Sequence, residues 1–174
     1  MSHSQRRQPL FPTKIHLYDA DVTGGECHKE SNRYDAGKEA VLVETPAGML
    51  GLSICYDLRF PHLYRTLAQA GAQILAVPSA FTKFTGNAHW HTLLRARAIE
   101  TGCFIIAPAQ TGTHPANRET YGHSLIINPW GDIIAEAEEE PGYIIAEIDI
   151  NDCDTTRRQL PSLSCNPDFE VAKY

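Results

Sequence analysis

The chain has 174 residues, 43% of them hydrophobic and 21% charged, which is typical of a single domain with a buried core. Its net charge of -6 argues against the clustered basic face of a nucleic-acid-binding protein. The longest apolar runs, such as Ile74–Val77 and Phe104–Pro108, are too short to span a bilayer, so the sequence predicts a soluble protein.

The first residues and the cysteines bear on location. The N-terminal residues contain no apolar stretch of the kind that a secretory signal needs. The five cysteines include no CxxC pair and no regular spacing, which argues against a disulfide framework or a zinc site. Because free thiols suit a reducing compartment, a cytoplasmic location is expected.

Apolar periodicity predicts seven strands along the chain. These are Ala40–Glu44, Met49–Cys55, Gln73–Pro78, Cys103–Gln110, His123–Asn128, Asp132–Ala137 and Tyr143–Asp149. Between the fifth and the sixth, Pro129–Asp132 has the composition of a hairpin turn.

Two segments have helical spacing. Pro61–Ala70 begins with a proline and stops before Gly71. Ala88–Thr101 follows Asn87 as an expected N-cap and stops at Gly102. Strands that alternate with helices predict an α/β domain, and the closing hairpin predicts a mixed sheet.

The clearest candidate for chemistry lies in Gly51–Pro61. The predicted buried strand ends at Cys55, so its thiol would project from the C-terminal edge of the sheet, where α/β proteins build their sites. Asp57 and Arg59 lie beside it and would form an ion pair that fixes the turn. The alternative is that Cys55 is a small buried hydrophobe, which is a common role of cysteine.

Four segments follow one another in order: KIHLYDAD at 14–21, GLSICYDLRFP at 51–61, PSAFTKFTGNAHWHTLLRARAIETGCFIIAPAQTG at 78–112, and YGHSLIINPWGDIIAE at 121–136. Together they resemble the nitrilase superfamily of carbon–nitrogen hydrolases, most closely its small-amidase branch, which includes deaminated glutathione amidase and omega-amidase. The resemblance implies a partial α-β-β-α sandwich of the nitrilase type without its N-terminal strands and helices. Residues 14–150 would be the C-terminal portion of the hydrolase domain, 1–13 a non-matching segment and 151–174 a C-terminal extension.

The resemblance also assigns catalytic residues. Cys55 matches the nucleophile, Lys14 the lysine that stabilises the oxyanion, and Glu30 a second glutamate that positions groups in the pocket. The family's general-base glutamate lies far upstream of the lysine, where this sequence has no match for it. Without the resemblance, Lys14 and Glu30 would both be interpreted as solvated residues.

Other residues are expected around the pocket. The resemblance places a backbone N–H near Tyr56 in the oxyanion site and puts Asp57, Arg59 and His123 close by. His89, His114 and His123 fall in different elements, so structural or solvated roles are expected for them rather than metal binding. Ser79 and Ser124 lack the GxSxG context of a serine hydrolase.

The implied reaction is hydrolysis of a small linear amide to an acid and ammonia through a cysteine thioester, without metal or cofactor. Little or no turnover is expected of the isolated chain, because a positioned general base contributes roughly 10²–10⁴-fold. The alternative is a non-catalytic remnant that acts as an assembly or interaction subunit. In either case the expected partner is a second copy of the chain or a full-length relative.

Overall fold

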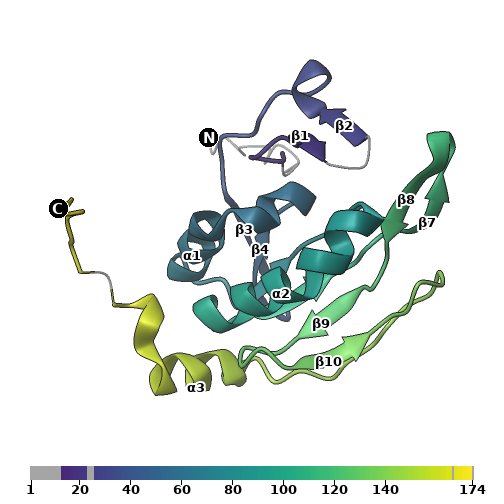
Figure 1. Cartoon of the computed structure of the whole chain (residues 1–174). Coiled ribbons are helices and arrows are strands. Elements are labelled where there is room, and N and C mark those ends of the chain that lie inside the picture. The colour runs from purple at the N-terminus through teal and green to yellow at the C-terminus, as the bar shows by residue number, and fades with distance from the viewer. Residues whose placement is uncertain (1–12, 23–25, 166, 174) are drawn as a thin grey trace, which may run out of the picture.

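A six-stranded mixed sheet forms the centre of the computed structural model, which describes residues 13–22, 26–165 and 167–173 (Figure 1). Its strands, in spatial order, are β10 (Ile133–Glu136), β9 (Leu125–Ile127), β6 (Phe104–Ala107), β5 (Ile74–Ala76), β4 (Gly48–Leu52) and β3 (Val41–Thr45). The middle strands β4, β5 and β6 are parallel, whereas β3, β9 and β10 each pair antiparallel to their neighbours. The α/β fold and the mixed sheet predicted from the sequence are confirmed.

Two helices cover one face of this sheet. They are α1 (Pro61–Gln69) and α2 (Lys83–Thr101). Between them and the sheet lies the main core, which includes Tyr64, Trp90 and Leu75, each at most 1% exposed. Because β4, β5 and β6 are parallel, their carboxyl ends lie along one edge of the sheet, next to the N-terminus of α1.

The second helix begins earlier than the sequence predicts. Its N-cap is Thr82 rather than Asn87, because the Thr82 hydroxyl accepts a hydrogen bond from the backbone N–H of Thr85. Gly86 in the first turn lowers the helix propensity of this stretch. The predicted end holds, because Gly102 adopts the left-handed conformation that terminates the helix.

The opposite face of the sheet is only partly covered. At one end, Ile74 and Phe104 are buried against Cys153 of a third helix, α3 (Asn151–Gln159), which the sequence analysis did not predict. Toward the other end of the same face, Ile106 is 37% exposed. In the pairing of β5 with β6, the Ala76–Ile106 pair lies two residues beyond the Ile74–Phe104 pair. Side chains two residues apart in a strand point to the same face, so Ile106 lies on the same face as Phe104.

Two antiparallel hairpins stand outside the central sheet (Figure 1). The sequence analysis missed both of them. One joins β1 (Asp19–Val22) to β2 (Glu26–Lys29), and the other joins β7 (Thr111–His114) to β8 (Arg118–Tyr121). Short 3₁₀ helices complete the described structure at Glu30–Asn32, Cys55–Arg59 (η2), Pro115–Asn117 and Pro161–Leu163.

Two predicted strands require correction. The strand predicted to end at Cys55 ends at Leu52, because the chain turns into the 3₁₀ helix η2 at Cys55. Tyr143–Asp149 is not assigned as a strand in the described structure, although Ile148 packs against the cluster of Ile74, Phe104 and Cys153. None of the described helices has the length and apolar character needed to cross a bilayer. Apart from Thr13, the segment 1–13 lies outside the described residues.

Candidate active site

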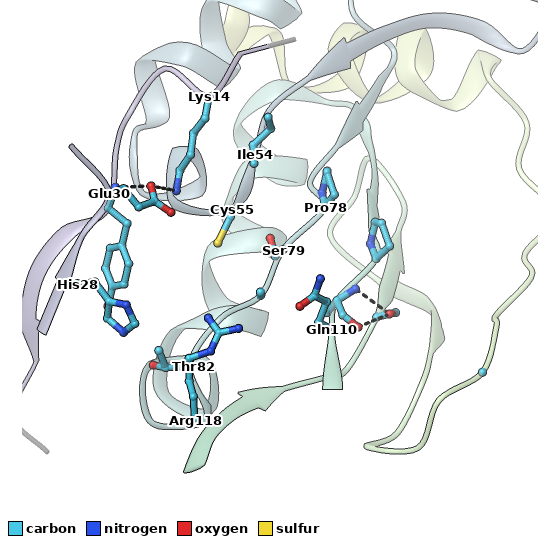
Figure 2. Close-up of a pocket in the computed structure, with 16 residues that line it drawn as sticks. Lys14, His28, Glu30, Ile54, Cys55, Pro78, Ser79, Thr82, Gln110 and Arg118 are labelled. Atoms are coloured by element: carbon cyan, nitrogen blue, oxygen red, sulfur yellow. Dashed lines mark hydrogen bonds and ion pairs between the residues drawn. The ribbon is translucent and has the colours of Figure 1, made fainter. Parts of the chain in front are cut away.

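Cys55 lies at the carboxyl edge of the parallel strands, in a cavity of about 600 Å³ (Figure 2). The segments that follow β5 and β6 form other walls of this cavity through Pro78, Ser79 and Pro108–Gln110. The backbone N–H of Cys55 donates to the carbonyl oxygen of Pro78 at 3.0 Å. The thiol therefore sits where parallel sheets present ligand sites, as the sequence predicts.

The backbone at Cys55 is held in an unfavourable conformation. Its φ is +51°, in the left-handed region that residues other than glycine rarely adopt. Such a residue costs on the order of 1–3 kcal/mol and persists only where the surroundings fix it. Strain of this kind clusters at functional sites, and here it aims the side chain out of the turn and into the cavity.

Asp57 fixes that turn. It is 1% exposed and accepts three hydrogen bonds: from the backbone N–H of Ile54 at 2.9 Å, and from the backbone N–H and the Nδ1 of His16, each at 2.8 Å. Asp57 thus ties the cysteine turn to the segment that carries Lys14.

The predicted ion pair between Asp57 and Arg59 is wrong. The three donors just described occupy the Asp57 carboxylate instead. The Arg59 guanidinium lies over the rings of Tyr56 and Phe81, at 5.9 and 5.2 Å from their centroids, and contacts His89 Nδ1 at 3.2 Å. Arg59 therefore packs the aromatic wall beside Cys55 rather than neutralising the buried acid.

Lys14 and Glu30 form an ion pair at the same cavity. Lys14 Nζ lies 2.5 Å from Glu30 Oε2, and the Tyr18 backbone N–H donates to that same oxygen at 2.7 Å. Both side chains line the cavity that Cys55 faces (Figure 2). The structure thus brings together the three residues that the resemblance singled out, from three separate segments.

Tyr56 and His123 are placed differently. Tyr56 follows Cys55 in η2, ahead of the first internal bond, which Asp57 N donates to Ile54 O at 3.1 Å. Its N–H therefore precedes the helical hydrogen bonds, as an oxyanion donor requires. His123 is not among the residues that line the cavity; its Nδ1 lies 2.9 Å from Glu136 Oε1.

The sequence analysis missed Arg118 and His28, which also line the cavity. They stand on β8 and β2, in the two hairpins that it did not predict. Figure 2 shows the Arg118 guanidinium directed toward the cavity from the side opposite Lys14. The sequence of the THPANRETYGHS segment does not indicate that Arg118 lies at the cavity, because it is the β7–β8 hairpin that brings this residue there.

The sequence profile described as carbon–nitrogen hydrolase matches residues 12–158. Deaminated glutathione amidase from Synechocystis is 52% identical over 152 residues, which cover 86% of this chain and 56% of that protein. The Homo sapiens deaminated glutathione amidase is 50% identical over 149 residues, covering 85% and 46%. The chain thus spans about half the length of these curated relatives.

Solved structures agree with the sequence matches. The C. elegans NitFhit protein superposes with a TM-score of 0.82 at 49% identity, covering 88% of this chain and 37% of that one. A mutant of the Nesterenkonia amidase, with the acetamide moiety of fluoroacetamide covalently added at its active-site cysteine, gives 0.67 at 27% identity, covering 84% and 52%. The chain therefore belongs to the carbon–nitrogen hydrolase family.

Proposed function

We propose that Cys55, Lys14 and Glu30 are the catalytic residues of an amidase that hydrolyses a small linear amide. The observation that carries this proposal is the strained Cys55, whose side chain faces a cavity that it shares with the Lys14–Glu30 ion pair. Acyl transfer needs a nucleophile and a group that stabilises the developing oxyanion. In this proposal Cys55 is the nucleophile, Lys14 is the cation for the oxyanion, and the Glu30 carboxylate orients that cation.

The reaction would proceed in two halves. The Cys55 thiolate attacks the amide carbon, and the resulting oxyanion accepts hydrogen bonds from Lys14 Nζ and the N–H of Tyr56. The C–N bond then breaks, a proton passes to the nitrogen, and ammonia leaves a thioester on Cys55. Water next attacks that thioester, the C–S bond breaks, and the carboxylic acid and the thiol are released.

Proton transfer limits this scheme in the described cavity. Glu30 is the one carboxylate among the described residues that line it, and its Oε2 already accepts from Lys14 and from Tyr18 N. A positioned general base contributes roughly 10²–10⁴-fold. We therefore expect the 174-residue chain on its own to turn over slowly or not at all.

The charges in the cavity point to a substrate with an acidic group. Glu30 balances the charge of Lys14, whereas Arg118 has no carboxylate partner among the described residues. A guanidinium in that position suits a substrate carboxylate. The name of the deaminated glutathione amidases, which are similar over this stretch, is consistent with such a substrate.

The rate of covalent labelling tests the proposal. Fluoroacetamide should modify Cys55 faster than the exposed Cys165, because the cavity holds the carboxamide beside the Cys55 sulfur. Peptide mass spectrometry over time gives both rates within one sample. Lys14→Ala should lower the Cys55 rate and leave the Cys165 rate unchanged, since Cys55, unlike Cys165, shares the cavity with Lys14.

The opposite result would favour a non-catalytic interaction subunit. If Cys55 reacts no faster than Cys165, the chain retains the fold without the chemistry. One observation supports this second candidate: the face of the sheet around Ile106 is apolar and open. Its partner would be a second copy of the chain or a longer relative.

Light scattering tests that surface. The chain should associate in a concentration-dependent manner, and Ile106→Glu should weaken the association. Phe169→Glu serves as the control, because Phe169 is 86% exposed in the C-terminal tail. A stable monomer at all concentrations would argue against the interaction role.

We propose the cytoplasm as the location of the protein. The four cysteines whose side chains are described are all free thiols, which fits a reducing compartment. A reporter fusion imaged in cells checks this assignment.

A further inference from the structure

Three potential metal ligands converge outside the active-site cavity. His91 comes from α2, His123 from the segment after β8, and Glu136 from the end of β10. Glu136 Oε1 lies 2.9 Å from His91 Nε2 and 2.9 Å from His123 Nδ1. The three ligand atoms all lie within 4.8 Å of one another. None of these residues lines the cavity that contains Cys55.

The backbone of His123 is built to hold this position. Its φ is +56°, and the preceding Gly122 has a φ of +71°, so two consecutive residues are left-handed. The indole N–H of the buried Trp90 donates to the His123 carbonyl oxygen at 2.7 Å. The Tyr121 ring stacks on the imidazole with centroids 4.4 Å apart. The strained backbone of His123, its hydrogen bond from the buried Trp90 and the stacked Tyr121 ring together fix the position of its imidazole.

His91 is positioned by the same anchor. It follows Trp90 directly in α2, so the helix that buries the indole also presents the imidazole to Glu136. Its ring meets that of His123 edge-on, with centroids 5.5 Å apart. Both imidazoles therefore approach the Glu136 carboxylate from two segments that the hydrogen bond from Trp90 to His123 holds together.

The geometry suits a small divalent cation. Zinc binds histidine nitrogen and carboxylate oxygen at about 2.0–2.2 Å, which places ligand atoms of a tetrahedral site roughly 3.3 Å apart. The 2.9 Å contacts need to open by a few tenths of an ångström, the two imidazole nitrogens, which lie within 4.8 Å of each other, need to move closer together, and each ligand nitrogen has to give up its proton. The side chains of His91, His123 and Glu136 are 30%, 22% and 37% exposed, so an ion can reach them and keep water as a further ligand.

We propose that His91, His123 and Glu136 form a binding site for Zn²⁺. The ion would join three elements that are distant in the sequence and would fasten β10, the strand at the edge of the sheet, to α2.

Zinc titration against a chromogenic chelator tests the site, after N-ethylmaleimide has capped the accessible thiols. The chain should bind one equivalent of Zn²⁺ that His91→Ala and Glu136→Gln each lose or bind at least roughly tenfold more weakly. His89→Ala is the matched control, because it removes an exposed imidazole two residues away on the same helix and should keep that equivalent.

A second readout separates binding from folding. Zn²⁺ should raise the melting temperature of the parent chain and of His89→Ala, but not that of Glu136→Gln, whose side chain keeps nearly the same shape. Circular dichroism establishes that each variant is folded. Equal zinc stoichiometry and equal thermal shifts in all four proteins would overturn the proposal.

Discussion

At the scale of single residues, the site depends on how the buried carboxylate of Asp57 is satisfied. Its three donors come from the cysteine turn and from His16, two residues after Lys14. Asp57→Asn puts an amide, which donates as well as accepts, beside the two backbone N–H groups of His16 and Ile54, which only donate. We expect a loss of about 1–3 kcal/mol in the free energy of unfolding, measured by urea denaturation, because a buried donor is left unpaired.

A second measurement on the same variant addresses function. Because Asp57 links the Lys14 segment to the Cys55 turn, its loss should also slow labelling of Cys55 by fluoroacetamide. Asp132→Asn is the control, since Asp132 lies in an exposed turn and should leave both quantities nearly unchanged. Full stability and full labelling in Asp57→Asn would contradict this role.

The apolar run that precedes Cys55 made this residue a candidate and the resemblance gave it a role, but Asp57 was paired with the wrong residue. Proximity in the sequence suggested Arg59, whereas a buried carboxylate is satisfied by whichever N–H groups point into its turn. His16 could not be foreseen as one of those donors, because it lies 41 residues away and reaches Asp57 only through the tertiary fold.

At the scale of elements, the packing of α2 against β8 depends on Gly86. A Cβ built there would lie 2.3 Å from the Cβ of Tyr121. Gly86→Ala should therefore destabilise the fold by about 1–3 kcal/mol, although alanine is the better helix former by about 1 kcal/mol. Thermal and urea unfolding measure the change. Gly142→Ala is the control, because nothing lies within 4 Å of a Cβ at that position.

Stabilisation by Gly86→Ala would mean that α2 and β8 are not packed as described. The same contact explains why the beginning of α2 and the β7–β8 hairpin were missed together. Residues 82–87 have weak helix propensity and gain their helical structure by packing on Tyr121. The strands β4, β5 and β6 were predictable, since buried parallel strands appear as continuous apolar runs.

At the scale of the whole molecule, two buried thiols make the stability sensitive to alkaline pH. Desolvation raises the pKa of Cys153 to about 12 and raises that of Cys103 as well, whereas a thiol in the unfolded chain ionises near about 8.5. The unfolded chain thus loses these protons first. Stability should be fully present below about pH 8.5 and should fall as the pH rises from there toward about 12.

Urea unfolding at about pH 8 and at about pH 10, on either side of the onset of thiol ionisation in the unfolded chain, measures this slope. Cys153→Ala should reduce it, because one of the two buried thiols is gone, whereas Cys165→Ser should preserve it, because Cys165 is exposed. An unchanged slope in Cys153→Ala would mean that Cys153 does not contribute to the alkaline loss.

The whole fold also limits what sequence patterns alone could predict about the site. The resemblance identified Lys14, Glu30 and Cys55, but the walls of the cavity come from segments after β5 and β6 and from both unpredicted hairpins. Arg118 enters the cavity through one of these hairpins. The composition of the cavity walls therefore depends on the tertiary fold, whereas Cys55 was a candidate from a single segment.

The most direct test of the central claim is mass spectrometry of the chain after incubation with a monoamide of a small dicarboxylic acid. The account predicts a mass increase equal to the acyl group on the peptide that contains Cys55, sensitive to hydroxylamine as a thioester is, and absent from Cys55→Ser. Acylation that is absent from Cys55, or that persists in Cys55→Ser, would contradict the assignment of Cys55 as the nucleophile.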